Sequence, residues 1–317
     1  MKKESYCNIA GLTADLGACT RLEVLVVEHN SIDFDVSRIP FSMLKKLRVL
    51  NIGRNRFRGV LTKDIGRAST VTVMQLNGNQ ISGQIPGALG LLSMLTVLDL
   101  SANQLSDPIP ETLGNLALLE DFSIAQNKFA GRIPSSVCNL VGLTRRLDLS
   151  RNNFFGTLPM ALGGMKWVKI IDLSRNMLSG GLPPSLGGCE SLISLDLSLN
   201  KLSGSIPSTW INMVSINKLD LSSNTLSGEI PPELGEISSL KRLDLSKNKL
   251  TGSVPSSLAN LPKLEMLDLS SNLLSGKIPD FPLFRSLRRS SFSGNPGLCG
   301  AILNLPCKSE IKVKHVA

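Results

Sequence analysis

A repeated pattern of apolar and polar positions runs along almost the whole chain. Segments of the form L-x-x-L-x-L-x-x-N-x-L recur about every 24 residues, and the clearest copies contain Asn200, Asn224 and Asn248. A fixed period of roughly 20 to 50 residues is the signature of stacked units that share one continuous core. The period therefore predicts a single solenoid, although a chain of 317 residues is long enough for two globular domains.

Each position of the repeat predicts a local structure. Leu195 and Leu197 alternate with Asp196, the period-two pattern of a short strand buried on one face. A Gly four residues after the Asn and a Pro seven after it predict a tight turn followed by an extended segment. Trp210 takes an inward leucine position and is interpreted as core rather than as a surface anchor. The expected fold is an α/β-type repeat, a right-handed leucine-rich-repeat solenoid with a parallel sheet on the concave face and turns or short 3-10 segments on the convex side.

The asparagine of each repeat is expected to point inward, where its amide can donate and accept hydrogen bonds with trapped backbone groups. Cys7 lies 23 residues before the first Asn, with Ile9 and Gly11 in the matching context, so it is assigned to the same column. The predicted ladder consists of Cys7, Asn30, Asn55, Asn79, Asn103, Asn127, Asn152, Asn176, Asn200, Asn224, Asn248, Asn272 and Asn295. Strands about 4.8 Å apart across twelve steps predict an arc of roughly 60 Å.

The candidate binding residues are strand positions that should face solvent on the concave side. Six residues before the Asn, four valines form an apolar column, and an exposed apolar strip is a hint of contact. Four residues before the Asn, most repeats carry Asp, interpreted as structural or solubilising, but the N-terminal repeats depart from it. The preferred surface comprises Val24, Val26, Glu28, His29, Val49, Asn51, Arg54, Val73, Gln75, Asn77, Val97, Asp121, Ser123 and Gln126. The alternative is that valines merely favour strands and the face is empty.

A second candidate surface is basic and flanks the aspartate column. It comprises Arg146, Arg151, Arg175, Lys218, Arg242 and Lys247. A further basic cluster between residues 45 and 67, opposed only by Asp64, suits either a solvated face or contact with an acidic protein or an acidic cell-wall polysaccharide.

Composition argues against several function classes. Aromatic residues make up only 4% of the chain, which leaves few rings to stack on bases and disfavours nucleic acid. His29 and His315 are the only histidines, and no phosphate-binding Gly-rich loop, zinc-ligand spacing or Ser, His and Asp set occurs. We therefore expect no enzyme activity, no metal and no cofactor. No apolar run is long enough to span a bilayer, and residues 1–20 do not resemble a secretory signal.

The cysteines and the chain ends divide the sequence into three parts. Cys19 and Cys189 occupy inward positions and should be buried free thiols, and Cys138 should be buried too. Cys299 and Cys307 lie outside the repeat and are expected to form a disulfide that seals the last coil. The predicted organisation is a repeat array over 1–292 with an incomplete, uncapped first coil, a C-terminal cap over 293–307 and a flexible tail over 308–317.

The LSGxIP continuation of the repeat, at 202–207, 226–231 and 274–279, resembles the plant-specific class of extracellular leucine-rich repeats. The closing SGNPGLCG and PC segment at 293–307 is similar to the C-terminal cap of receptor-kinase ectodomains. The resemblance implies a non-catalytic module of the cell surface that recognises a protein or peptide ligand, with a co-receptor as a second kind of partner. Some receptors of this class hold a peptide carboxylate with two arginines one residue apart on a strand, and no strand here has such a pair in its outward columns.

Three binding roles remain open from the sequence. The first is the recognition module of a receptor-like kinase or receptor-like protein. The second is a cell-wall enzyme inhibitor of the polygalacturonase-inhibitor type, whose basic segment would also contact acidic pectin. The third is an intracellular scaffold, which free thiols and the absence of a recognisable signal would permit.

Overall fold

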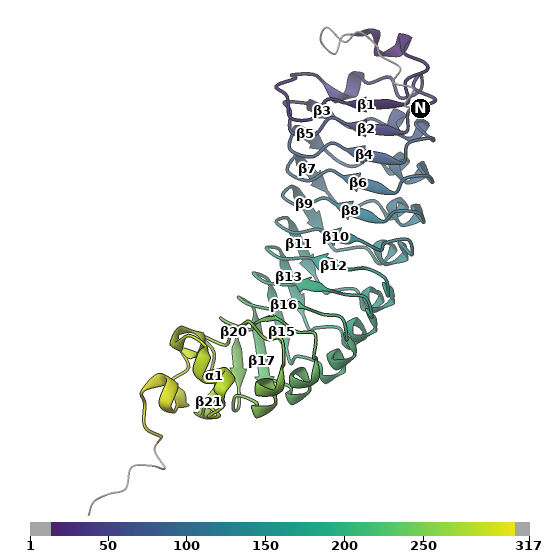
Figure 1. Ribbon diagram of the computed structural model, residues 1–317. Helices are drawn as coiled ribbons and strands as arrows, with labels where there is room; N and C mark the ends of the chain where they lie inside the picture. Colours follow the sequence, from purple (N-terminus) through teal and green to yellow (C-terminus); the bar gives the residue numbers. More distant parts are fainter. Residues whose placement is uncertain (1–13, 308–317) are drawn as a thin grey trace, which may run out of the picture.

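The computed structural model describes residues 14–307, which form a curved and twisted column of stacked coils (Figure 1). One coil follows another in sequence order from the N-terminal end to the C-terminal end. Residues 1–13, which include Cys7 and the start of the predicted incomplete first coil, and the predicted tail at 308–317 lie outside the described residues. None of the described helices has the length and apolar character needed to cross a membrane.

A parallel sheet forms the concave face, with one three-residue strand from each coil. Its eleven strands within residues 14–307 are β1 (Val24–Val26), β2 (Val49–Asn51), β4 (Val73–Gln75), β6 (Val97–Asp99), β8 (Asp121–Ser123), β10 (Arg146–Asp148), β12 (Ile170–Asp172), β14 (Ser194–Asp196), β16 (Lys218–Asp220), β18 (Arg242–Asp244) and β20 (Met266–Asp268). The central residue of every strand is buried and the flanking two face outward, as with Leu195 between Ser194 and Asp196.

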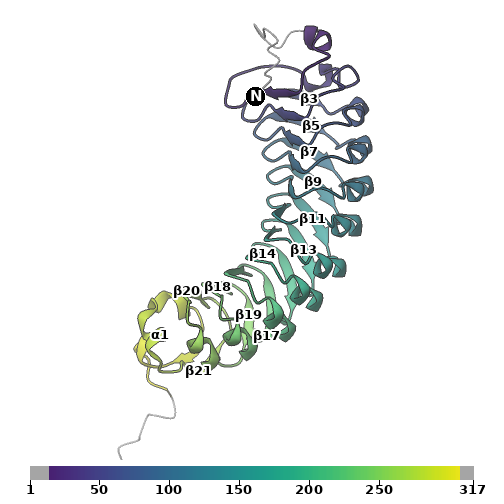
Figure 2. The same ribbon diagram turned by 45° about the vertical axis from the view of Figure 1, so that its right-hand side comes forward.

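A second parallel sheet, which the sequence did not lead us to expect, follows the asparagine turn of nine consecutive coils within residues 14–307 (Figure 2). Its strands are β3 (Arg58–Val60), β5 (Gln80–Gly83), β7 (Gln104–Asp107), β9 (Lys128–Gly131), β11 (Asn153–Gly156), β13 (Met177–Gly180), β15 (Lys201–Gly204), β17 (Thr225–Glu229) and β19 (Lys249–Thr251). Gly180 and Gly204 end their strands at φ of 79° and 76°, a left-handed conformation that a side chain would strain. The repeated Gly thus lets each strand pair and then turn outward.

Short 3-10 helices form the outer side of the coils. They are η1 (Ala14–Ala18), η2 (Val36–Arg38), η3 (Lys63–Arg67), η4 (Gly87–Leu91), η5 (Glu111–Asn115), η6 (Ser135–Asn139), η7 (Met160–Gly164), η8 (Pro184–Gly188), η9 (Ser208–Asn212), η10 (Pro232–Glu236) and η11 (Ser256–Asn260). Two further 3-10 helices, η12 (Arg289–Phe292) and η13 (Ala301–Leu303), belong to the C-terminal end. Pro183 and Pro207 precede η8 and η9 in extended conformation, as their fixed φ favours. Trp210 is fully buried and its Nε1 donates to the Pro183 carbonyl at 3.0 Å, which confirms its interpretation as core.

The asparagine side chains join neighbouring coils through their backbones. Asn200 Nδ2 donates to the carbonyls of Leu173, Leu197 and Ser198 at 3.0–3.2 Å, and its Oδ1 accepts the N–H of Leu178 at 3.0 Å. The same four-bond set recurs at Asn55, Asn79, Asn103, Asn127, Asn152, Asn176, Asn224, Asn248, Asn272 and Asn295. Asn30, in the first described coil, is exposed and donates to the carbonyls of Val27 and Glu28.

The cysteines differ from expectation at two positions. Cys189 is a buried free thiol, as predicted, but Cys138 is free and only partly buried. Cys19 is disulfide-bonded, so the prediction of a free thiol there is wrong. The local sequences around Cys19 and Cys189 are alike, and only the three-dimensional surroundings distinguish a paired sulfur from an unpaired one. Burial raises the pKa of the Cys138 and Cys189 thiols to about 11, which disfavours the reactive thiolate.

The C-terminal end closes the column with irregular elements. In the last coil η12 stands in place of a strand, and β21 (Ser275–Lys277) pairs with β22 (Gly297–Cys299) beside α1 (Pro282–Ser286). Cys299 and Cys307 form a disulfide with their Cα atoms 5.1 Å apart. Within residues 14–307 the concave sheet has eleven strands, and ten steps of about 4.8 Å give it a span of about 48 Å. The Cys7 coil counted in the predicted arc of roughly 60 Å lies outside these residues.

Replacing one ladder asparagine should destabilise the array strongly. In Asn200→Ala, the buried N–H of Leu178 loses its acceptor, and the carbonyls of Leu173, Leu197 and Ser198 each lose one of two donors, so we expect the free energy of unfolding to fall by about 2–3 kcal/mol. Asn30→Ala is the matched control, since its exposed amide can be replaced by water, and should cost less than about 1 kcal/mol. Urea unfolding followed by circular dichroism compares them, and equal losses would contradict the role of the ladder.

Candidate functional site

The register of the concave sheet brings the predicted strand residues together in two adjacent columns. One column runs through Val24, Val49, Val73, Val97 and Asp121, and the other through Val26, Asn51, Gln75, Asp99 and Ser123. The first strand is the most accessible, because Val24 and Val26 are 54% and 51% exposed. Val49, Val73 and Val97 are half-buried by their neighbours, so the apolar column is open mainly at its N-terminal end.

The remaining residues of the preferred surface lie in the turns beside these columns. His29, Arg54 and Gln126 are exposed and have left-handed φ values of 52–57°, and Asn77 is half-buried. Arg54 Nη1 lies 3.2 Å from His29 Nε2, so the two side chains touch across adjacent coils. Glu28 Oε2 accepts a 2.9 Å hydrogen bond from Asn51 Nδ2. The N-terminal turns therefore form a polar rim along the valine column.

The basic candidates divide into two rows. Arg151, Arg175 and Lys247 are exposed in the same left-handed turn position as Arg54. Arg146, Lys218 and Arg242 lie on the strands, where the first two form ion pairs with carboxylates. Arg146 Nε contacts Asp121 Oδ1 and Lys218 Nζ contacts Asp196 Oδ2, each at 2.8 Å. The positive charges on the strands are thus largely neutralised by carboxylates, whereas the basic side chains in the turns remain charged and exposed to solvent.

The aspartate column has a structural role in its own turns. Oδ1 of Asp196 accepts the backbone N–H of Ser198 at 3.1 Å and its hydroxyl at 2.7 Å. The N–H bond to the residue two positions later recurs at Asp99, Asp148, Asp172, Asp220, Asp244 and Asp268. Asn51 fills the same role with its own Oδ1 toward Gly53 N, at 3.1 Å. Val26 and Gln75 cannot accept this bond in the same way, so the N-terminal departures from Asp are not explained by turn formation.

Two carboxylates of the aspartate column have a raised pKa. Burial is the largest cause of the raised pKa of Asp172, and the charges of Asp196 and Asp148 add to it, against hydrogen bonds from Ser174. Asp220 has a raised pKa for the same reasons. Burial alone would lower the pKa of Arg146, but its hydrogen bond and ion pairs with Asp121, and the charges of Asp99 and Asp148, raise it overall. No basic side chain within residues 14–307 forms an ion pair with Asp172.

The basic segment at 45–67 does not form one surface. Lys45, Lys46 and Arg48 line an open hollow that precedes the concave strands, together with Glu23. Arg58 lies on the second sheet and pairs with Asp33 at 2.9 Å, while Lys63 and Arg67 lie on the outer helix η3. Because these charges are spread around the coil, they offer no continuous cationic patch to an acidic polymer.

An exposed apolar edge was not recognised in the sequence. It lies at the end of η4 and in the segments that lead from the outer helices to the concave strands, and it consists of Leu91, Met94, Leu118, Val141, Trp167 and Val214. Val141 and Trp167 also line a small hollow of about 150 Å³ beside Cys138. Their spacing in the repeat is irregular by one or two residues, so no single column of the repeat revealed them.

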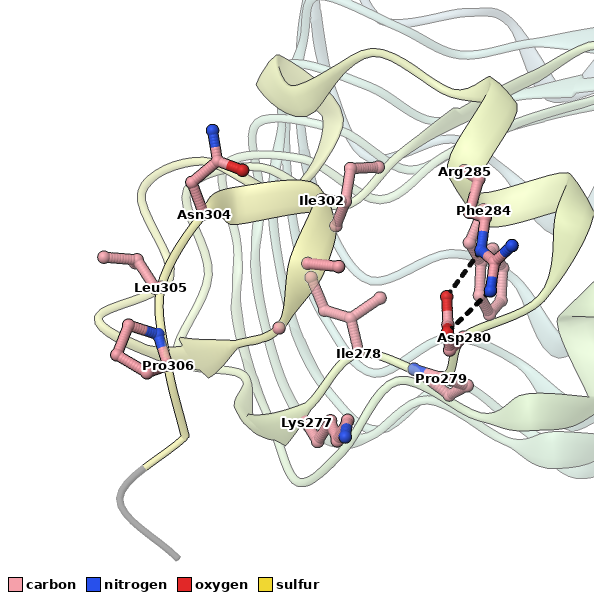
Figure 3. Close-up of a pocket in the computed structure, with 12 residues that line it drawn as sticks. Lys277, Ile278, Pro279, Asp280, Phe284, Arg285, Ile302, Asn304, Leu305 and Pro306 are labelled. Atoms are coloured by element: carbon pink, nitrogen blue, oxygen red, sulfur yellow. Dashed lines mark hydrogen bonds and ion pairs between the residues drawn. The ribbon is translucent and has the colours of Figure 1, made fainter. Parts of the chain in front are cut away.

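A pocket of about 360 Å³ lies at the C-terminal end, between the last coil and the segment Gly300–Pro306 (Figure 3). Asp280 and Arg285 face one another across two 2.7 Å hydrogen bonds, and Ile278, Ile302 and Leu305 supply apolar surface. The hydrogen bond from Arg285 lowers the pKa of Asp280. Because the two charges satisfy each other, this pocket offers a ligand less unpaired charge than the concave face does. The pocket combines segments far apart in sequence, so no motif marked it.

The repeat pattern of this chain matches models of a known protein family. Leucine-rich-repeat family models match residues 94–116, 144–165, 167–189, 191–213 and 215–237, and a second such model matches 229–274. The stacked parallel strands, outer 3-10 helices and asparagine ladder agree with those matches. The chain is a leucine-rich-repeat domain. Among curated protein sequences, none matches it significantly.

This leucine-rich-repeat domain closely resembles the ectodomains of plant receptor kinases. A TDR receptor shares 34% identity over 92% of this chain and 49% of the receptor chain, with a TM-score of 0.82. The Arabidopsis receptor kinase HAESA, solved in complex with the peptide hormone IDA and the co-receptor SERK1, shares 32% identity over 93% of this chain and 57% of its own, with a TM-score of 0.72. The chain thus spans about half the length of these receptors.

The same fold also occurs in a protein of another kind. A plant ice-binding protein shares 28% identity over 90% of this chain and 84% of its own, with a TM-score of 0.69. Since one fold hosts unrelated ligands, function has to be argued from the surface of the concave sheet. The repeat fold itself is typical of non-catalytic recognition domains.

Removing the unpaired carboxylate of Asp172 should stabilise the domain near neutral pH. A raised pKa means that the folded state holds the proton more tightly than the unfolded chain does, so ionised Asp172 destabilises the fold. Asp172→Asn should therefore raise the free energy of unfolding at pH 7 by roughly 0.2–1 kcal/mol, the range for like charges on facing strand positions. The gain should vanish near pH 3, below the ordinary Asp pKa of about 3.9.

Asp196→Asn is the control for this change, because Asp196 has the 2.8 Å ion pair with Lys218 and its loss should bring no gain. Urea unfolding midpoints at both pH values provide the measurement. An Asp172→Asn variant that is no more stable than the parent at pH 7 would contradict the assignment.

Proposed function

We propose that this domain is the recognition part of a plant cell-surface receptor and binds a peptide or an extended protein segment along the N-terminal half of its concave sheet. The observation that carries the proposal is the two-column surface, where Val26 and Gln75 replace the Asp that serves the turns elsewhere. Accessible valines beside a polar rim provide the apolar centre and polar border that protein interfaces favour. The likeness to HAESA, solved with a peptide hormone and a co-receptor, supports the same class of partner.

The dimensions of the sheet suit an extended ligand. The whole concave sheet spans about 48 Å, the length of roughly 14 residues of extended peptide at about 3.4 Å per residue, so a ligand held at the N-terminal half has room to continue along the rest. The role we propose is binding without catalysis, with an extracellular location. The Cys299–Cys307 disulfide fits an oxidising compartment. The dispersed basic segment gives no specific support to a pectin-binding enzyme inhibitor, so we do not adopt that alternative.

Selection of peptide ligands tests this function. A phage library of random 14-residue peptides is panned against the domain, and the affinity of the selected peptides is measured by calorimetry. Val24→Glu and Val26→Glu place charges in the exposed apolar end of the surface without disturbing the core, so we expect affinity to fall about tenfold or more.

Met160→Glu is the matched control, because Met160 is as exposed as these valines but lies on the outer helix η7. Its affinity should stay within about twofold of the parent, as for a residue outside an interface. Peptides that lose affinity with Met160→Glu but not with either valine variant would show that the concave surface is not the binding site.

A further inference from the structure

Three side chains at the centre of the concave sheet hold oxygen atoms in a row across adjacent strands. Asp99 on β6, Ser123 on β8 and Asp148 on β10 are in register, and all three face outward. The column has Asp in every strand from β6 to β20 except β8, so Ser123 leaves a gap between two carboxylates. The shorter Ser123 side chain therefore lies between two carboxylates of the same column.

These oxygens have hydrogen-bonding capacity that the fold does not use. Oδ1 of Asp99 accepts from Ser101, and Oδ1 of Asp148 accepts from Ser150. In each carboxylate, Oδ2 accepts no hydrogen bond from any of the described side chains or backbone groups. The Ser123 hydroxyl is buried, with 1% of the residue exposed, and has no hydrogen-bond partner within residues 14–307. A buried polar group without a partner costs free energy, which a suitable ligand can recover.

The Arg146 side chain extends across these three residues but forms no hydrogen bond with their free oxygen atoms. Its Nε contacts Asp121 Oδ1 at 2.8 Å, whereas Nη2 and Nη1 remain 3.7 Å from Asp99 Oδ2 and 3.9 Å from Asp148 Oδ2. Only the first contact is within hydrogen-bonding distance. Since the guanidinium touches residues of both β6 and β10, it lies over Ser123 on the strand between them.

The charges at this position do not balance. The side chains of Asp99, Asp121 and Asp148 are only 12–17% exposed. Against these three carboxylates stand Arg146 and Arg145, and Arg145 is 60% exposed and 3.8 Å from Asp121, so solvent screens it. Asp172 on the adjoining strand adds a further carboxylate without an ion pair among the described residues. The site therefore retains a net negative charge that favours a cation.

We propose that Asp99, Ser123 and Asp148 bind a primary ammonium group of a peptide ligand, while Arg146 keeps its contact with Asp121 and gives up the two longer ones. An ammonium group has three N–H donors and no acceptor, which matches Asp99 Oδ2, Ser123 Oγ and Asp148 Oδ2. A guanidinium fits less well, because its planar fork favours two oxygens of one carboxylate. A metal ion is disfavoured, since the described residues contain no group of His, Cys, Asp or Glu placed to hold one.

This inference rests on the proposed peptide-binding function and specifies one position of the ligand. The ammonium group belongs either to a lysine side chain or to the peptide N-terminus. Both sources present the same chemistry to the site, and short peptides that carry only one of them can distinguish the two.

Titration with small cations, followed by amide chemical shifts in nuclear magnetic resonance spectra, tests the site on the intact domain. Butylammonium should produce saturable shifts at residues 99–101, 121–124 and 146–150. Tetramethylammonium carries the same charge but no N–H donor, and should produce none there. If both ions act alike, or butylammonium causes no saturable shift in these segments, the proposal is wrong.

Variants separate the site from general electrostatic attraction. Ser123→Ala removes a hydroxyl that has no partner in the fold, so it should leave stability intact and weaken butylammonium binding about threefold or more. Asp148→Asn should weaken it about tenfold. Asp244→Asn removes an equal charge four strands away in the same column and should stay within about twofold. Equal effects of Asp148→Asn and Asp244→Asn, or none from Ser123→Ala, would overturn the assignment.

The source of the ammonium group is decided by two peptides. Acetyl-Gly-Lys-Gly amide offers only the side-chain amine, and Gly-Gly-Gly amide offers only the N-terminal amine. Binding by either peptide, abolished in Asp148→Asn, supports the site and names the source, whereas binding by neither overturns it. The selected 14-residue peptides keep this test separate from the general function. If they respond to Val24→Glu but not to Asp148→Asn, the concave binding surface stands and only the ammonium site fails.

Discussion

The structure depends on one constraint, which is that every coil must pair the backbone groups it buries against its neighbours. Asn200 shows how this is done, with one amide bonded to three carbonyls and one N–H of two coils. A leucine in its place would pack, but it would leave the buried N–H of Leu178 without an acceptor and take one of two donors from each of the three carbonyls. The repeat therefore needs Asn at this position, and the stacking of coils follows from it.

Because the asparagine ladder and the leucines stabilise the interior, the outward strand positions are not needed for core packing. Most coils still use one of them, since the Asp of the concave column binds the backbone of its own turn. The N-terminal coils depart from this arrangement at Val26 and Gln75, whose side chains do not bind the backbone of the following turn. A position that is free of structural demand yet differs from its repeats is a reasonable place for recognition, which loops and exposed faces commonly provide on a rigid scaffold.

Stacking identical strands also has an electrostatic cost. Burial, and then the charges of the carboxylates in register, raise the pKa of Asp172 and Asp220, and Arg146 and Lys218 offset part of the repulsion in this column. The compensation is uneven, because each cation reaches only the strands beside it. The concave face thus has local regions of excess negative charge, and these regions rather than the net positive charge of the chain decide which ligand groups it attracts.

The sequence by itself determined the solenoid, the concave strands, the inward asparagines and the buried Trp210, because each depends on spacing within one repeat. It also placed the candidate columns, since strand alternation fixes which side chains face outward. The tertiary structure alone decided the second sheet, the pairing of Cys19 and the place of Arg146 above Ser123. Those features depend on the distances between atoms of neighbouring coils, and the pattern of residues within one repeat does not contain these distances.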